Sequence, residues 1–360
     1  MHKSFHLQGG SFDSAEELIS FAETISKELH QFLSEWFDDE SSIVLKTSGS
    51  TGIPKTIHIK KQLMKNSAKS TGDFFDLGVG TRALCCLSVT YIAGKMMVVR
   101  ALELGWDLDF VAPVNNPLAQ AFDAYDFCAM VPLQVKASLW DLHLVKKLLI
   151  GGGVVTYDLC EHLQGLSTEC FASYGMTETV SHIAIKKLNS VELPFSEDRI
   201  GSSVAKKLSL AKRNPYVLLP NISISQDDRR CLVIDAPLLN EEKVITNDMV
   251  DIYSETEFEW LGRYDHVINS GGVKLHPEEI EKELSKIISK RFFVAGIPDQ
   301  HLGEKLVLII EGKPEFYDFS NVTLSKYQTP KQIIFVDEFV STVTKKIQRK
   351  KTLDLITSLK

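Results

Sequence analysis

The 360-residue sequence lacks the features that mark secreted, zinc-binding and membrane-spanning proteins. Its 6 cysteines include no CxxC pair and no Cys/His cluster with zinc spacing, so we expect buried free thiols. No apolar run reaches the roughly eighteen residues that a membrane span needs, and the polar residues 1–10 offer no signal peptide. These absences favour a protein of the reducing cytoplasm.

Positive charge is also scarce. The 40 lysines and arginines are outnumbered by 47 acidic residues, which gives a net charge of -7, and no basic run could follow a phosphate backbone. We therefore expect no nucleic-acid partner. The absence of a GxGxxG motif argues against a nicotinamide-dependent dehydrogenase, and the absence of GxSxG argues against a serine hydrolase.

The apolar residues that are present follow clear periodicities. Residues 14–39 predict one long amphipathic helix, and the length of the chain predicts about two domains. Short apolar runs then alternate with helical patterns, which predicts an α/β domain whose helices pack on a mostly parallel sheet. We expect strands at residues 42–45, 56–60, 83–89, 108–111, 127–131 and 148–150, and helices at 61–75, 93–104, 118–125 and 157–163.

The pattern changes after Ser181. Shorter β-branched segments at residues 216–219, 231–234, 249–253 and 258–261 predict an antiparallel subdomain. A glycine-rich crossing at 262–272 precedes a helix that begins at Pro277 and strands at 292–295, 305–310 and 332–336. We therefore predict a large domain over residues 1–264 and a small mobile α+β lid over residues 265–360.

One loop carries the clearest chemical signal. Between two expected strands lie Thr47, Ser48, Gly49, Ser50, Thr51, Gly52, Ile53, Pro54 and Lys55. The glycines let the backbone approach an anion, the hydroxyls donate hydrogen bonds and the lysine adds positive charge, so the segment suits a polyphosphate. It is not a Walker A loop, because the second glycine of that motif would fall on Pro54. In isolation such a run is also compatible with a plain surface turn.

Further motifs follow in order along the chain. They are Gly151-Gly152-Gly153, Ser173-Tyr174-Gly175-Met176-Thr177-Glu178, Thr246-Asn247-Asp248, Gly262-Arg263-Tyr264-Asp265 with Ile268-Asn269-Ser270-Gly271-Gly272, and Lys345-Lys346-Ile347-Gln348-Arg349. Together with residues 47–55, this series resembles the adenylate-forming superfamily of acyl-CoA synthetases, luciferases and peptide-synthetase adenylation domains. Asn247 and Lys345 stand where that superfamily usually has glycine.

The resemblance implies a site for ATP and Mg²⁺. Residues 47–55 would hold the phosphates, and Gly151, Gly152, Gly153 and Tyr174 would contact the adenine. Ser173 and Gly175 would also belong to the nucleotide site. Thr177 would contact the α-phosphate, Glu178 would bind Mg²⁺, Asp248 would accept the ribose hydroxyls, and Arg263 would contact the nucleotide.

The resemblance also assigns roles within the lid. Asp265 would be the hinge, and Lys346 would be the catalytic lysine, although Lys345 is its neighbour. Ser270, Gly271 and Gly272 would line the path of the pantetheine arm of coenzyme A.

The activity that this resemblance implies is an ATP-dependent, AMP-forming acid:CoA ligase, which converts a small carboxylate to an acyl-adenylate and then to a thioester. Residues 87–94 and Arg100 are similar to the o-succinylbenzoate:CoA ligases of menaquinone biosynthesis, with Tyr91 in place of the usual histidine. Lys95 or Arg100 would then hold the second carboxylate of the acid. The alternative for both cations is an exposed position on a helix.

Other functions remain compatible with the sequence. The acid could be another aryl or acyl acid, the acceptor could be a carrier protein, and the chain could be a nucleotide-binding pseudoenzyme. Only 46 residues precede the phosphate loop, which implies a shortened N-terminal portion. We expect the surface left by that shortening to be covered by the helix at residues 14–39, covered by a partner chain, or left uncovered, so a homodimer is one compatible assembly.

Overall fold

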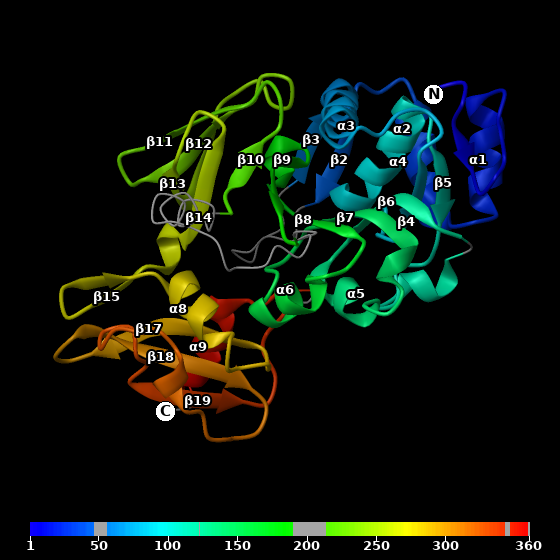
Figure 1. Ribbon diagram of the computed structural model, residues 1–360. Helices are drawn as coiled ribbons and strands as arrows, with labels where there is room; N and C mark the ends of the chain where they lie inside the picture. The colour runs from blue at the N-terminus through cyan, green and yellow to red at the C-terminus, as the bar shows by residue number, and fades with distance from the viewer. Residues whose placement is uncertain (47–55, 122, 190–213, 343–345, 359–360) are drawn as a thin grey trace, which may run out of the picture.

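The computed structural model describes residues 1–46, 56–121, 123–189, 214–342 and 346–358. Its main feature is a twelve-stranded sheet in the order β1-β5-β4-β6-β7-β8-β9-β10-β14-β13-β12-β11 (Figure 1). The expected α/β architecture is confirmed. No helix in these ranges is long and apolar enough to cross a membrane.

The first half of the sheet is parallel and buried on both faces. Its strands are β1 (His6–Leu7), β4 (Arg82–Cys85), β5 (Asp107–Phe110), β6 (Tyr125–Met130), β7 (Val145–Ile150) and β8 (Glu169–Gly175). Alternate residues of β4 enter opposite cores, with Ala83 packed under the helices of one face and Leu84 under those of the other.

The second half of the sheet is antiparallel. It comprises β9 (His182–Lys187), β10 (Tyr216–Leu218), β11 (Ser223–Gln226), β12 (Cys231–Asp235), β13 (Val244–Ile252) and β14 (Glu257–Arg263). The predicted antiparallel pairing is therefore confirmed. These strands continue the large sheet, because β9 pairs with β8.

Helices cover both faces of the parallel half. One face carries α3 (Lys61–Phe75) and α4 (Ile92–Leu104), and the other carries α5 (Pro132–Ala137) and α6 (Tyr157–Leu163). Helix α4 is buried along most of its length. A side chain at Gly94 would overlap the carbonyl oxygen of Ser88, so this glycine lets the first turn of α4 lie directly on the preceding loop.

Two local predictions are wrong. The expected helix over 14–39 is two helices, α1 (Ala15–Glu23) and α2 (Lys27–Phe37), because Ser26 is extended and its side chain accepts a hydrogen bond from the backbone of Leu29, starting a new helix. The expected helix over 118–125 is a 3₁₀ turn (Pro117–Gln120) followed by β6. The strands predicted at residues 42–45 and 56–60 are confirmed as β2 (Ser42–Lys46) and β3 (Thr56–Lys60), which form an antiparallel pair outside the large sheet.

The last part of the chain builds a sheet of its own, in the order β16-β15-β18-β17, with β19 beside β18. Its elements are β15 (Ile268–Ser270), β16 (Val273–Leu275), α8 (Pro277–Leu284), β17 (Phe292–Asp299), β18 (Gly303–Glu311), β19 (Gln332–Val336) and α9 (Arg349–Ser358). Leu308 packs with α8 on one face of this sheet, and Ile309 packs with α9 on the other. Figure 1 shows this unit beside the end of β14.

Candidate active site

Three of the predicted nucleotide-binding residues meet where β8, β13 and β14 lie near one another. Tyr174, at the end of β8, donates a hydrogen bond of 2.7 Å from its hydroxyl to Asp248 on β13. Asp248 lies opposite Arg263 of β14, whose Nη1 is 3.7 Å from the Asp248 carboxylate. Burial and the Asp248 charge raise the pKa of Tyr174, which keeps this hydroxyl a hydrogen-bond donor.

Arg263 also reaches the predicted hinge. Its Nε donates to Asp265 at 3.0 Å and its Nη2 donates to the second oxygen of the same carboxylate at 3.2 Å. Burial alone would lower the pKa of Arg263, but the carboxylates of Asp265 and Asp248 raise it. One guanidinium thus links the candidate ribose reader to the first residues after β14.

Asn247, which stands in place of the usual glycine, has a structural partner. Its side-chain oxygen accepts a hydrogen bond of 2.8 Å from Arg229, and Arg229 also donates to the carbonyl of Thr246 at 3.1 Å. The substitution therefore anchors the segment that carries Asp248 to the β11–β12 turn.

The predicted glycine turn lies next to β8. Gly151 follows β7, and a Cβ atom on it would lie 2.6 Å from the hydroxyl of Ser173. Gly152 has φ +76°, a left-handed conformation that favours glycine. The carboxyl ends of β7 and β8 therefore bring Gly151, Gly152 and Ser173 to one edge of the sheet, the usual place for ligands in parallel α/β sheets.

The segment after Glu178 is strained. Val180 has φ 66° and ψ -54°, and the backbone N–H of Ser181 donates to the carbonyl of Thr179 at 2.7 Å, which defines a γ-turn of the rare left-handed kind. A buried β-branched residue in this conformation is costly, and such strain concentrates at functional sites. The amide of Asn240 donates to the carbonyl of Glu178 at 3.0 Å and holds the turn from the other side.

A second polar cluster lies behind this turn, around the buried Arg100 of α4. Its Nε donates to the hydroxyl of Thr71 on α3 at 3.2 Å, and its Nη2 lies 3.5 Å from the hydroxyl of Ser181. Within the described residues, no carboxylate lies within ion-pair distance of Arg100. Burial lowers the pKa of Arg100 to about 10, which leaves it charged at neutral pH.

The same cluster contains His182, the first residue of β9. Its Nε2 lies 3.4 Å from the Thr71 hydroxyl, and both side chains are buried. Burial, and then the nearby Arg100, lower the pKa of His182 well below its ordinary value, so this histidine is neutral. Sequence reasoning missed His182, Thr71 and Ser181, and only the place of Ser181 and His182 just after Glu178 could have indicated them.

The other two candidates for binding the acid lie elsewhere on α4. Lys95 is buried, 3.5 Å from Glu35 of α2 and 4.3 Å from the ring centre of Phe32, so it faces the N-terminal helices rather than Arg100. Tyr91 precedes α4 and is 38% exposed. An exposed position on the helix is wrong for both cations, because Lys95 and Arg100 are each buried.

Lys346 and the glycine hairpin belong to the C-terminal unit. The backbone N–H of Lys346 donates to the Thr342 hydroxyl at 3.1 Å. Partial desolvation lowers the pKa of the Lys346 amine, although the residue as a whole is exposed. Gly271 and Gly272 have φ of 59° and 81°, and they form the two-residue turn between β15 and β16. The predicted phosphate loop at residues 47–55, and Lys345, lie outside the described residues.

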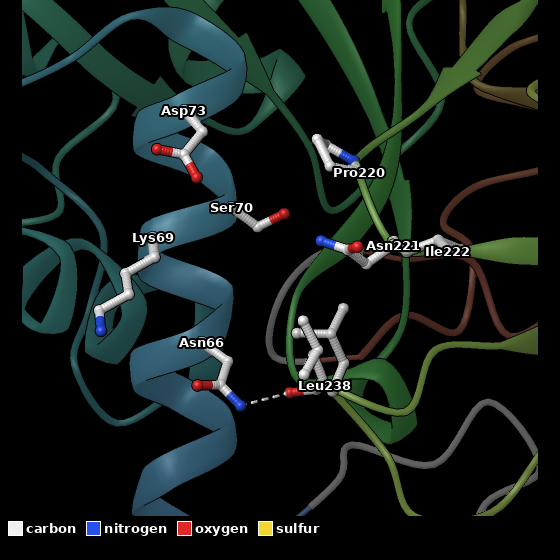
Figure 2. Close-up of a pocket in the computed structure, with 9 residues that line it drawn as sticks. Asn66, Lys69, Ser70, Asp73, Pro220, Asn221, Ile222 and Leu238 are labelled. Carbon is white, nitrogen blue, oxygen red and sulfur yellow. Dashed lines mark hydrogen bonds between the residues drawn. The ribbon is translucent and has the colours of Figure 1, made fainter.

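A separate hollow of about 210 Å³ lies between α3 and the β10–β11 connection (Figure 2). Asn66 and Ser70 of α3 face Asn221 and Leu238 across it, and Lys69, Asp73, Pro220 and Ile222 also line it. The amide of Asn66 spans it and donates to the carbonyl of Leu238 at 2.9 Å. None of the residues predicted from the sequence to form the site lines this hollow.

The chain is similar to known acid:CoA ligases along most of its length. It is 25% identical to the 2-succinylbenzoate–CoA ligase of Enterococcus faecalis over 94% of this chain and 74% of that protein. It is also 25% identical to the enzyme of that name from Escherichia coli over 78% of this chain, and there it spans 60% of the relative's length.

Two solved structures extend the comparison. An acyl-CoA synthetase (AMP-forming)/AMP-acid ligase II-like protein from Dyadobacter fermentans is 37% identical, with a TM-score of 0.58 over 92% of this chain and 95% of that chain. The o-succinylbenzoate CoA synthetase of Bacillus subtilis in complex with its acyl-adenylate intermediate is 19% identical and shares the fold, with a TM-score of 0.71 over 86% of this chain and 68% of that chain. The family model described as AMP-binding enzyme matches residues 3–209, and the chain therefore belongs to the AMP-binding enzyme family.

Proposed function

We propose that this protein is an ATP-dependent, AMP-forming acid:CoA ligase whose acid is o-succinylbenzoate or a closely similar aryl dicarboxylate. The observation that carries the choice of acid is Arg100, a buried guanidinium with hydroxyl partners and no carboxylate partner among the described residues. An unpaired buried charge is expensive, and an anionic ligand would offset that cost. A dicarboxylate supplies this anion while its other carboxylate reacts. Several relatives also carry the name 2-succinylbenzoate–CoA ligase.

The nucleotide would occupy the carboxyl edge of the sheet. Tyr174 would lie against the adenine and Asp248 would accept the ribose hydroxyls, with Arg263 beside them. The residues present fit Mg²⁺, because this ion is usually held by one or two carboxylates together with substrate phosphates and water, and Glu178 supplies such a carboxylate. Bound there, the ion would neutralise phosphate charge. Residues 47–55 would hold the pyrophosphate portion of ATP.

The two half-reactions would use two positions of one lid. We propose that residues 265–360 turn about Asp265 relative to residues 1–264. In one position the Lys346 amine would stabilise negative charge between the attacking carboxylate and the α-phosphate, together with Thr177. In the other position Lys346 would withdraw, and Ser270, Gly271 and Gly272 would line the path of the CoA thiol to the acyl-adenylate.

We propose the cytoplasm as the location, and a homodimer as one way to cover the surface around α1 and α2. The alternatives are that the acceptor is a carrier protein in place of CoA, that the substrate is another aryl or acyl acid, or that the chain binds nucleotide without catalysis.

Product analysis tests the proposal. We would incubate the protein with ATP, Mg²⁺, CoA and o-succinylbenzoate and follow AMP and the acyl thioester by mass spectrometry, with Lys346→Ala as the matched control. We expect both products from the native protein and a loss of roughly 10²- to 10³-fold in adenylation from the control. AMP without thioester would indicate another acceptor, and no AMP with any aryl acid would contradict the assignment.

A further inference from the structure

The side chain of Arg349 contacts α8, a helix of the C-terminal unit, and not the described residues of the nucleotide site. Arg349 is the first residue of α9, three positions after Lys346. Its Nη2 lies 2.7 Å from the Glu281 carboxylate of α8, and its Nη1 lies 3.8 Å from Glu278 of the same helix. Its guanidinium also lies 5.6 Å from the ring centre of Phe293.

The chain between Lys346 and Arg349 is short and held at both ends. The carbonyl of Lys346 accepts a hydrogen bond from the backbone N–H of Thr342 at 2.9 Å, and the N–H of Lys346 donates to the Thr342 hydroxyl at 3.1 Å. The backbone N–H of Gln348 donates to the carbonyl of Val340 at 2.8 Å. Three residues span at most about 10 Å even when extended. A displacement of the Arg349 side chain from α8 would therefore reach the backbone of Lys346.

Glu281 makes this attachment selective for a cation. One carboxylate oxygen accepts a hydrogen bond of 2.9 Å from the backbone of Val294, and the other faces Arg349. Burial raises the pKa of Glu281 to about 7, with Arg349 acting in the opposite direction. Above that pH, loss of Arg349 would leave a buried carboxylate without its cation.

We propose that Arg349, held by Glu281 and Glu278, is a positioning residue that fixes where the Lys346 amine can reach during adenylation. This inference rests on the proposed function, in which Lys346 acts in the first half-reaction only. Glu278 also contacts His266, one residue beyond the hinge, at 2.5 Å. Helix α8 therefore contacts Arg349 through Glu278 and Glu281, and it contacts the residue after the hinge through Glu278. Turning of the lid and the position of Lys346 are coupled through this helix.

The test separates the two half-reactions at pH 8, where Glu281 is ionised. Variants Arg349→Gln, Arg349→Lys and Glu281→Gln are compared with Lys290→Gln, which removes another ion pair of the C-terminal unit, Lys290–Glu315 at 2.7 Å. Adenylation is measured by pyrophosphate release, and thioester formation is measured with supplied acyl-adenylate and CoA. For Arg349→Gln we expect kcat for adenylation to fall about 10- to 100-fold, with KM values nearly unchanged, because a charge-assisted contact is lost.

The second half-reaction should stay within about threefold of the native rate, and Arg349→Lys should recover part of adenylation because it keeps the charge without the fork. Equal loss of both half-reactions, or full adenylation in Arg349→Gln, would overturn the inference.

A second readout does not depend on activity. The rate at which an amine-reactive ester labels Lys346, followed by mass spectrometry, should change at least threefold in Arg349→Gln and stay unchanged in Lys290→Gln. An unchanged labelling rate in folded Arg349→Gln would also overturn the inference. If the native protein is inactive but the labelling rate of Lys346 still changes at least threefold in Arg349→Gln, the result would count against the proposed function and not against this inference.

Discussion

Single residues set the electrostatics of the candidate acid site. Arg100 is buried and donates to the hydroxyls of Thr71 and Ser181 and, at 3.8 Å, to the thioether of Met97. Ser67 supports Ser181 through a hydroxyl contact of 2.6 Å. Each of these hydroxyls is neutral, so the site keeps a full positive charge for a ligand. That arrangement distinguishes Arg100 from Lys95, whose charge is already paired with Glu35.

His182 gives this cluster a pH dependence that can be measured. The folded chain holds it neutral, whereas the unfolded chain binds a proton near the ordinary pKa of 6.5. The unfolded state therefore takes up more protons as the pH falls below about 6.5, and the free energy of unfolding should decrease by up to about 1.4 kcal/mol per pH unit for this group. Arg100 and the Thr71 hydroxyl are the charged and polar groups that face it.

Urea unfolding at pH 7.5 and pH 5.5 checks this expectation. His182→Gln should lose less stability than the native protein between the two pH values. An identical loss in both proteins would contradict a buried neutral histidine at this position.

At the scale of elements, α4 depends on close contact with the loop before it. In Gly94→Ala the added methyl group would overlap the carbonyl of Ser88 and lie 2.7 Å from that of Leu87, and backbone atoms cannot rotate away. We expect a destabilisation of about 1–3 kcal/mol or more by chemical denaturation, and a weaker acid affinity because α4 carries Arg100. Gly78→Ala is the matched control, since nothing lies within 4 Å of its added methyl group, and it should be nearly neutral.

Element boundaries show what local sequence could and could not predict. Helices α3 and α6 agree with the predicted residues 61–75 and 157–163, because each has a clear apolar stripe and polar neighbours. The break between α1 and α2 was missed because the apolar spacing continues across Ser26, and only its capping geometry reveals the new helix. The Arg100 cluster could not be assembled, since α3, α4 and β9 meet only through tertiary packing.

The nucleotide motifs were more accessible to sequence reasoning than the acid site was. Tyr174 lies close to Asp248, and Asp248 lies opposite Arg263, as the resemblance to one nucleotide site implies. In the sheet, β9 and β10 lie between the strand of Tyr174 and the strands of Asp248 and Arg263. Their spacing in the chain carries no information on distance in space. The strained turn at Val180 carried no signal either, because valine is rare in a left-handed conformation.

For the whole molecule, the orientation of the C-terminal unit is sensitive to Gly262. This residue, the last but one of β14, has φ +138°, and a side chain there would overlap the Glu278 carboxylate of α8. Gly262→Ala should therefore disfavour the present orientation and shift the balance between the two half-reactions. We expect the ratio of adenylation to thioester formation to change at least fivefold, measured as above. Some loss of melting temperature should accompany this change, because φ +138° also strains an alanine within β14. An unchanged ratio would show that this contact does not control orientation.

In the proposed function, Arg100 holds the second carboxylate of an aryl diacid during CoA ligation. The most direct measurement compares kcat/KM for o-succinylbenzoate with that for 4-oxo-4-phenylbutanoate, which lacks one carboxylate, in the native protein and in Arg100→Met. The native protein should prefer the diacid by about 10- to 100-fold, the worth of a charge-assisted pair, and Arg100→Met should lose most of that preference while still forming AMP from the monoacid. A preference for the diacid that survives intact in Arg100→Met would contradict the account.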